Sequence, residues 1–291
     1  MVAKGHHVLG VDCFTNYYPK RIKLSNVSKL RKMRKFKLVE ADLSSARLSP
    51  MLHDVECVFH LAAQPGVRAS WGASFSHYVK DNIVATQRLL EALKATKIKK
   101  MVYASSSSIY GDAERLPTPE HATPQPVSPY GATKLVGEHL CHVYFRNYGV
   151  PVTALRYFTV FGPRQRPDMA FHKFITRISA GKEIEVFGDG EQRRDFTFVG
   201  DIVAGNILAI DAEPGTIYNV GAGRTTALND VIATMETIIG KKARIKRREV
   251  ARGDVRSTAA DISRISQELG YSPRTTLAEG LRQQVDAQLT R

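Results

Sequence analysis

The sequence is short of cysteine, of long hydrophobic runs and of acidic residues. Only Cys13, Cys57 and Cys141 occur in 291 residues, and their spacing matches no metal site. All three lie in apolar or strand-like stretches, so we expect reduced packing residues in a cytosolic (cytoplasmic) protein. The longest apolar runs are far below the ~18 residues that a membrane span requires. Residues 1–5 lack the apolar core of a signal peptide. We therefore expect no membrane partner.

The deficit of acidic residues leaves a net charge of +14, from 42 Lys and Arg against 28 Asp and Glu. Residues 20–37 carry nine basic residues and no acid, and residues 241–252 carry seven with only Glu249 against them. Such segments are typical either of nucleic-acid binding or of a solvated basic surface that steers small anions. Neither segment interleaves aromatic residues with its charges or matches a nucleic-acid motif. We favour the second interpretation and expect no nucleic-acid partner.

Strand-like runs alternate with helical patterns in the first half of the chain, which indicates a parallel sheet covered by helices. The expected strands are residues 7–11, 36–41, 55–60, 100–104 and 152–157. Apolar residues at a spacing of 3.6 predict helices over 76–96 and 130–148. After residue 163 short strands mix with helices, which are expected near 170–181, 201–211, 227–239, 261–268 and 277–289. The fold class is therefore α/β, with a Rossmann-like doubly wound parallel sheet.

One feature of that fold is missing near the start of the sequence. A dinucleotide-binding fold opens with a strand, a glycine-rich turn and a helix whose amino end holds the pyrophosphate. No such turn occurs here, and residues 1–5 are typical of the last turn of that helix. We therefore expect that the sequence starts about twenty residues too late. The missing strand is central in the usual 3-2-1-4-5-6 order. We also expect weak dinucleotide binding by residues 1–291 alone.

The most informative motif is Tyr130-Gly131-Ala132-Thr133-Lys134. On a helix this spacing puts Tyr130 and Lys134 on one face. A nearby ammonium favours the phenolate and lowers the pKa of a tyrosine from about 10 toward neutrality. Such a tyrosine can act as a general base. The alternative is an ordinary surface pair on a helix.

The context of this motif carries a family resemblance. The strand at 100–104 ends in four serines, Ser105–Ser108, and a proline-rich loop leads to Ser128, a plausible helix cap. The chain, from about residue 5 to about residue 288, resembles the extended short-chain dehydrogenase/reductases, in the nucleotide-sugar epimerase and dehydratase group. The resemblance implies NAD as cofactor. It places the catalytic trio on Ser106, Tyr130 and Lys134.

The resemblance also implies a set of cofactor contacts. Asp12 ends a strand where the family presents an acid to the adenosine ribose, which favours NAD over NADP; the alternative is a capping or turn aspartate. Further contacts fall on residues that follow strands or begin helices. They are Asn16, Asp42, Leu43, Leu61, Ala62, Ala63, Asn82, Tyr130, Lys134 and Tyr157.

The reaction implied by the resemblance starts when the Tyr130 phenolate takes a proton from a sugar hydroxyl while hydride leaves the same carbon. Ser106 holds the reacting oxygen, and return of hydride to the opposite face epimerises that carbon. Dehydratases and decarboxylating relatives carry an acid between this serine and the Tyr-Gly pair. Here Ser107-Ser108-Ile109 offers only hydroxyls, so we expect epimerisation.

The run from Tyr157 to Ala170 resembles that of UDP-glucuronate 4-epimerases. Galactose-type epimerases have Asn at the place of Thr159. The hydroxyls of Ser107, Ser108 and Thr159 can surround a C6 carboxylate, with Arg166 or Arg68 adding charge. For Arg166 the alternative is a salt bridge to Asp168.

Two further segments imply the contacts with the nucleotide part of the UDP-sugar. Residues 187–196 resemble the family's uridine and diphosphate segment, and residues 252–255 its later ribose and phosphate segment. The substrate contacts implied there are Phe187, Gln192, Arg194, Arg252 and Asp254. The family arginine often stands where this chain has Ala251, so Arg252 is assigned as its substitute. Asn219 is expected to be structural.

We therefore predict an isomerase, an NAD-dependent UDP-sugar 4-epimerase acting on UDP-glucuronate. UDP-glucose 4-epimerase and a catalytically silent UDP-sugar-binding fragment are the alternatives. Residues 1–162 are expected to form the cofactor domain, and 163–291 a smaller C-terminal α/β substrate domain with some chain crossing back. The resemblance also implies a homodimer formed through helices 76–96 and 130–148.

Overall fold

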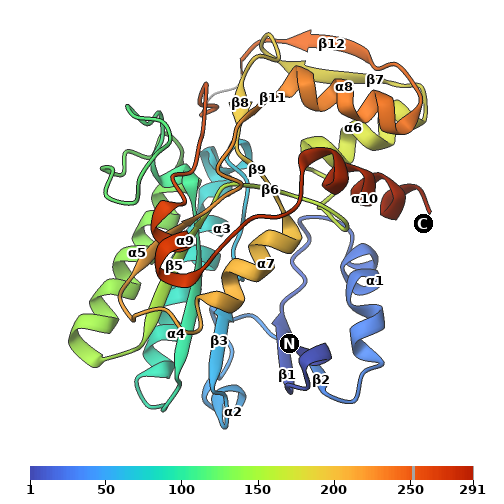
Figure 1. Cartoon of the computed structure of the whole chain (residues 1–291). Helices are drawn as coiled ribbons and strands as arrows, with labels where there is room; N and C mark the ends of the chain where they lie inside the picture. Colours follow the sequence, from blue (N-terminus) through green and yellow to red (C-terminus); the bar gives the residue numbers. More distant parts are fainter. Residues whose placement is uncertain (251–252, 291) are drawn as a thin grey trace.

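The computed structural model describes residues 1–250 and 253–290. Its larger sheet is parallel, with strand order β10-β5-β4-β3 (Figure 1). These strands are β3 (Cys57–His60), β4 (Lys100–Ser106), β5 (Val152–Tyr157) and β10 (Ile217–Val220). The helices packed on this sheet are α4 (Ala85–Leu93), α5 (Pro129–Tyr148), α7 (Val199–Leu208) and α9 (Ser263–Leu269). The fold class predicted from the sequence is confirmed.

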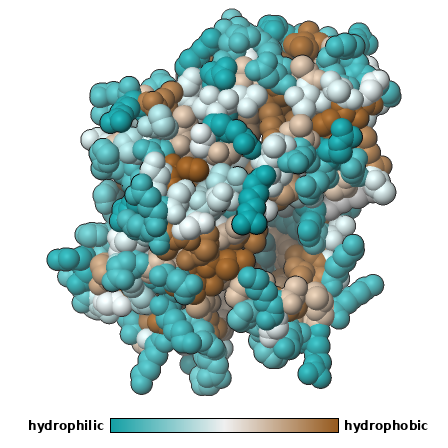
Figure 2. Space-filling model, viewed as in Figure 1, coloured by the Kyte–Doolittle hydropathy of each residue, from teal (hydrophilic) through white to brown (hydrophobic). Residues whose placement is uncertain are grey.

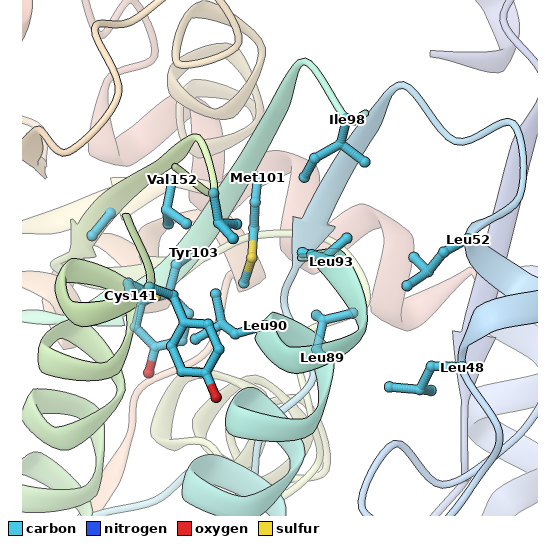
Figure 3. Packing of buried hydrophobic residues seen from close by; sticks show 13 residues of the cluster. Leu48, Leu52, Leu89, Leu90, Leu93, Ile98, Met101, Tyr103, Cys141 and Val152 are labelled. Atoms are coloured by element: carbon cyan, nitrogen blue, oxygen red, sulfur yellow. The ribbon is translucent and has the colours of Figure 1, made fainter. Parts of the chain in front are cut away.

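Strand alternation decides which helices cover each face of this sheet. On β4, Met101 and Tyr103 pack with α4 and α5, whereas Val102 between them packs with α7 and α9. Figure 3 shows the first of these clusters, with leucines of α4 meeting Met101, Tyr103 and Cys141. The ends of β4 and β5 are therefore fixed from both sides.

A separate parallel pair lies beside this sheet. β1 (Val8–Asp12) pairs with β2 (Phe36–Glu40), and α1 (Lys20–Arg31) connects them. In the part of the chain that the structure describes, neither strand is hydrogen-bonded to β3. The single continuous sheet of a doubly wound fold is thus present here as two sheets.

The third body of packing lies at the C-terminal end, at the top of Figure 1. Its strands are β6 (Thr159–Phe161), β7 (Glu183–Phe187), β8 (Arg193–Arg194), β9 (Phe196–Phe198), β11 (Thr226–Ala227) and β12 (Arg244–Arg248). Its helices are α6 (Ala170–Ser179), α8 (Leu228–Ile239) and α10 (Leu277–Leu289). Their apolar faces share one core. No helix in residues 1–250 and 253–290 is long and apolar enough to cross a membrane.

The face of the molecule seen in Figure 2 carries apolar as well as polar residues. Figure 2 shows hydrophobic residues gathered over α7. On that helix the side chain of Val203 is 51% exposed. Basic residues and apolar patches therefore share the surface.

The predicted elements differ from the structure in two places. The helix expected over 76–96 is α3 (Phe75–Tyr78), a π-helical turn (Val79–Val84) and α4. The helix α1 was not predicted, because its basic residues obscure its apolar ones. The remaining short helices are α2 (Ser49–Leu52) and 3-10 turns at Val2–Lys4, Arg68–Ser70, Gly72–Ser74 and Ser107–Ile109.

Two glycines let α5 lie close to β4. A β-carbon at Gly131 would overlap the Ser108 carbonyl oxygen, and one at Gly137 would overlap the Tyr103 hydroxyl and lie 2.6 Å from Cζ of that ring. The Tyr103 side chain is 1% exposed and cannot move away freely. The close approach brings the first turns of α5 to the serines that end β4.

We expect Gly137→Ala to lower the free energy of unfolding by about 1–3 kcal/mol, although alanine normally favours a helix. Urea unfolding measures this directly. In a Tyr103→Phe background the loss should shrink, because the hydroxyl that the new methyl meets first is gone. An unchanged midpoint in Gly137→Ala would contradict the close packing described here.

Candidate active site

The candidate site lies where β4 and β5 end. Ser106 is the register partner of Tyr157, so the two strands end side by side. Ser128 caps α5 as predicted, with its hydroxyl accepting from the Gly131 amide at 3.1 Å. The helix therefore begins with Tyr130 beside the serine run. Ligands of open α/β sheets bind at this edge.

Lys134 is not a surface residue. It is 4% exposed, and its Nζ donates to the Ala104 carbonyl of β4 at 2.6 Å. Burial lowers the pKa of Lys134 to about 8. The interpretation of Tyr130 and Lys134 as an ordinary surface pair is therefore wrong.

The predicted effect of Lys134 on Tyr130 needs a correction. Burial raises the pKa of Tyr130 above its ordinary value, while a hydrogen bond from Ser106 and the positive charge of Arg166 act in the opposite direction. The Lys134 charge is not among the groups that shift the pKa of Tyr130, and its ammonium donates to the Ala104 carbonyl. In this structure Ser106 and Arg166 are the groups that favour the phenolate.

A cavity of about 390 Å³ lies between the β1–β2 pair and the end of β3. Six of the predicted cofactor residues line it: Asp12, Asp42, Leu43, Leu61, Ala62 and Ala63. Five others do not: Asn16, Asn82, Tyr130, Lys134 and Tyr157. Sequence reasoning missed several lining residues, among them Cys13, Phe14, Tyr17 and Tyr18. The available signal was the aromatic pair Tyr17-Tyr18, in the loop that follows the β1 acid Asp12.

The two carboxylates of this cavity are held differently. Asp12 accepts the Phe14 amide at 2.6 Å, so the turn-aspartate interpretation describes one of its oxygens. Asp42 accepts from Lys80 at 2.6 Å and from the Ser44 hydroxyl at 2.7 Å, and these hydrogen bonds lower the pKa of Asp42 to about 2. Asp42 is thus ionised and fixed in place at neutral pH.

Asn82 acts on the loop that lines the cavity. It is 1% exposed, and its Oδ1 accepts the Gln64 amide at 2.6 Å. Its Nδ2 donates to the Gln64 carbonyl at 3.0 Å and to Thr133 of α5 at 2.9 Å. These bonds use both Nδ2 protons and one acceptor site of Oδ1, so in this structure Asn82 positions the loop, and its contact with the cofactor stays a prediction. The π-helical turn that carries Asn82 is a type often found at functional sites.

Tyr157 is also engaged within the protein. Its hydroxyl donates to Asn206 of α7 at 2.7 Å, and burial raises its pKa. The ring nonetheless remains half-buried at the strand end.

His60 at the end of β3 is a buried histidine, and its hydrogen bonds show which ring nitrogen carries the proton. Its Nε2 lies 2.9 Å from Thr86 Oγ1, whose own proton goes to the Asn82 carbonyl at 2.6 Å. Nε2 is therefore the donor. Burial, reinforced by the Lys134 charge, lowers the pKa of His60 to about 3.

This depressed pKa predicts acid sensitivity of the fold. The unfolded chain binds a proton at His60 below about pH 6.5 and the folded chain does not until about pH 3. Stability present above pH 6.5 is therefore lost as the pH falls, by about 1.4 kcal/mol per unit. Urea unfolding at pH 7 and pH 5 should show a flatter dependence in His60→Gln than in the wild type. Parallel slopes would contradict the prediction.

Three hydroxyls follow the ends of the two strands that carry the site, Ser107 and Ser108 after β4 and Thr159 after β5. Ser107, Ser108 and Thr159 are half-buried. Among residues 1–250 and 253–290, none of these hydroxyls has a hydrogen-bond partner. The Thr159 amide, in contrast, is fixed by donating to the Asp195 carbonyl at 3.0 Å. The three oxygens are therefore available to a ligand on a fixed backbone.

Arg166 makes the salt bridge that was the alternative interpretation for it. Its guanidinium binds both oxygens of Asp168 at 3.0 Å and lies 5.7 Å from the centre of the Tyr17 ring. It also lines the cavity and acts on Tyr130 by its charge. The salt bridge to Asp168 thus holds the Arg166 guanidinium at the cofactor cavity, where its charge also acts on the candidate base Tyr130.

A second group of predicted residues meets farther out. Arg68 pairs with Asp254 at 2.6 Å and lies over the Phe187 ring, 4.0 Å from its centre. Arg68 therefore belongs with these residues rather than with the three hydroxyls. Gln192 donates to the Phe187 carbonyl at 3.0 Å, and burial lowers the pKa of Arg194.

Two predictions at this end have different outcomes. Asn219 is buried, donates to the Thr118 carbonyl at 2.9 Å and accepts from Tyr110 at 2.7 Å, which confirms a structural role. Arg252 lies outside the described residues.

Comparisons with known proteins agree over most of the chain. The model of the NAD dependent epimerase/dehydratase family matches residues 1–221. The uncharacterized UDP-glucose epimerase YtcB of Bacillus subtilis is 43% identical, over 97% of this chain and 90% of that protein. The UDP-glucuronate 4-epimerase of Thermodesulfobacterium geofontis is 37% identical, over 98% of this chain and 90% of its own length. The crystal structure of UDP-glucuronic acid 4-epimerase from Bacillus cereus, in complex with UDP-glucuronic acid and NAD, is similar with a TM-score of 0.96 and 42% identity. This match covers 99% of this chain and 92% of that one.

Proposed function

The chain belongs to the NAD-dependent epimerase/dehydratase family, and on that premise we propose that it is a UDP-glucuronate 4-epimerase. The observation that carries the proposal is the set of three unpartnered hydroxyls, Ser107, Ser108 and Thr159, which follow the ends of β4 and β5. Ser106, the last residue of β4, hydrogen-bonds Tyr130, which is also under the charge of Arg166. Hydroxyl donors and one nearby guanidinium suit a sugar carboxylate.

The cofactor site fits NAD in its chemistry. Asp12 keeps one carboxylate oxygen for a ribose hydroxyl, and an ionised acid at this place repels a 2′-phosphate. Leu61, Ala62 and Ala63 offer backbone and apolar surface along the same cavity. When bound, NAD accepts hydride from the sugar C4 and returns it.

Tyr130 and its neighbours move the proton. The phenol oxygen takes the proton of the C4 hydroxyl as hydride leaves and gives it back after hydride returns on the other face. Ser106, which already hydrogen-bonds the phenol, orients the reacting oxygen. No acid stands between Ser106 and Gly111, so elimination of water lacks an agent.

The nucleotide contacts in this proposal come from the outer group. Phe187 and Gln192 are assigned to the uracil end, and Arg194 and Asp254 to the ribose and diphosphate, together with Arg252 by its place in the sequence. Burial of Arg194 supports a guanidinium prepared for an anion. Arg68 is assigned to the same end.

We further propose a cofactor half over residues 1–162 and a substrate half over 163–291, in a cytoplasmic homodimer. Exposed apolar side chains, Val84 in the π-helical turn before α4 and Val136 and Val143 on α5, support pairing through these helices.

The proposal is tested by incubating the protein with saturating NAD and either UDP-glucuronate or UDP-glucose, followed by chromatography and mass spectrometry. We expect UDP-galacturonate from the first and little reaction with the second. The name of the Bacillus subtilis relative favours UDP-glucose as the second candidate, and preference for that sugar would establish it. Binding of both sugars without turnover would instead indicate a silent UDP-sugar-binding protein.

A further inference from the structure

A buried carboxylate lies on the catalytic face of α5. Glu138 follows Lys134 by four residues, as Lys134 follows Tyr130, so all three side chains share one face of the helix. The Glu138 side chain is 4% exposed. Its Oε1 accepts from Arg156 Nε at 3.0 Å, and its Oε2 accepts from Arg156 Nη2 at 2.8 Å. Oε1 also accepts from the Ser105 hydroxyl.

These two partners sit at one level of the sheet. Ser105 of β4 and Arg156 of β5 are register partners, and the next pair is Ser106 and Tyr157. Glu138 thus joins both strands to α5 one residue before the catalytic serine. An error in the position of Glu138 would be transmitted to Ser106 through a single peptide unit.

Arg156 extends the contact beyond the helix. Its Nη1 donates to the Tyr110 hydroxyl and to the Glu120 carbonyl, each at 2.8 Å. Tyr110 in turn donates to Asn219 of β10 at 2.7 Å. The network therefore connects the turn after the serines, the proline-rich loop and the far strand of the sheet.

The energetics argue against a role in stability alone. A buried ion pair recovers little more than the cost of removing its charges from water, and apolar residues of similar volume often serve as well. What an apolar pair cannot supply is direction, since bidentate arginine–carboxylate bonds fix distance and angle. The network fixes distance and angle at the ends of β4 and β5, where a small displacement would misplace the reacting groups.

We propose that Glu138 and Arg156 are positioning residues that fix α5 against β4 and β5 and thereby set the distance between Ser106 and Tyr130. The proposal rests on the proposed function. Both side chains are 4% exposed and already partnered, so we expect neither to touch the substrate. Their effect on turnover acts through the geometry of the serine, the tyrosine and Lys134.

The first test compares Glu138→Gln with the wild type. The amide keeps the volume and one acceptor but loses the bidentate ion pair. We expect kcat to fall about 10- to 100-fold, because small misplacements of reacting groups cost about that much. KM for the UDP-sugar should stay within about threefold, since the nucleotide contacts are remote from Glu138.

Glu138→Gln leaves Arg156 without its charge partner and can fail to fold, so a second variant is required. Glu138→Leu/Arg156→Met replaces the pair by apolar side chains and should unfold cooperatively. We expect it to show the same loss of kcat. Leu90→Ala, in the core between α4 and the sheet, is the control: it should lower the unfolding midpoint and leave kcat of the folded enzyme unchanged.

Hydrogen exchange provides a readout that needs no substrate. The Ser108 amide donates to Ser106 Oγ at 3.1 Å, and amides of residues 103–110 should exchange faster in the double variant than in Leu90→Ala. Wild-type kcat together with unchanged exchange in the double variant would overturn the proposal. If the wild type converts neither sugar, the proposed function fails, while the exchange data still decide the positioning role.

Discussion

Tyr130→Phe is expected to lower kcat by about 10²–10⁴-fold, the usual contribution of a general base. The substitution removes the phenol oxygen, which hydrogen-bonds Ser106 and is under the charge of Arg166. The nucleotide contacts are unaffected, so the Kd for the UDP-sugar should stay nearly constant. Turnover under saturating NAD and calorimetric binding measure the two quantities separately.

Tyr148→Phe is the matched control, because it makes the same change on the same helix at a side chain that is 59% exposed. It should behave as the wild type. The pH dependence gives a second check: burial raises the pKa of Tyr130, so the rate should rise with pH as the phenolate forms. Wild-type turnover in Tyr130→Phe would rule out the mechanism.

Thr159→Val should lower UDP-glucuronate turnover by roughly 5- to 150-fold, since an unpaired buried polar group costs about 1–3 kcal/mol. A glucuronate oxidised at C4 is a β-keto acid, which loses CO₂ when the C5–carboxylate bond is parallel to the carbonyl π orbitals. Thr159, with Ser107 and Ser108, is assigned to holding the carboxylate out of that alignment. The variant should therefore release some 4-keto-pentose or xylose-type product, detectable by mass spectrometry.

Thr159→Ser keeps the hydroxyl and should retain clean epimerisation. UDP-glucose has no carboxylate, and any turnover of it should change little in Thr159→Val. If Thr159→Val and Thr159→Ser give the same product ratio, the carboxylate assignment fails and the UDP-glucose alternative gains support.

Local sequence patterns predicted most of the site, and long-range contacts account for what they missed. The Tyr130–Lys134 spacing and the Ser128 cap are properties of one helix, so both could be predicted. The bond from Lys134 to the Ala104 carbonyl crosses from helix to strand. No spacing rule indicates this bond, nor the burial that raises the pKa of Tyr130 where the spacing predicted a lower value.

The same distinction explains Asn82 and Glu138. The motif around Asn82 indicated a cofactor contact, but its partners Gln64 and Thr133 come from other segments and bury the side chain. Glu138 gave one local signal, its four-residue spacing from Lys134. Its partners, Ser105 and Arg156, could not be predicted, because only the register of β4 and β5 brings them together.

The path of the chain through β10 has a consequence for dissecting this protein. β10 follows the first C-terminal elements in sequence, yet it completes the larger sheet beside β5 (Figure 1). A protease cut in the exposed turn around Asp189 would leave two pieces that share one sheet and stay associated until denatured. Expressed separately, neither piece would hold the whole of the larger sheet. Genetic fusion or splitting should therefore respect this strand rather than the boundary near residue 162.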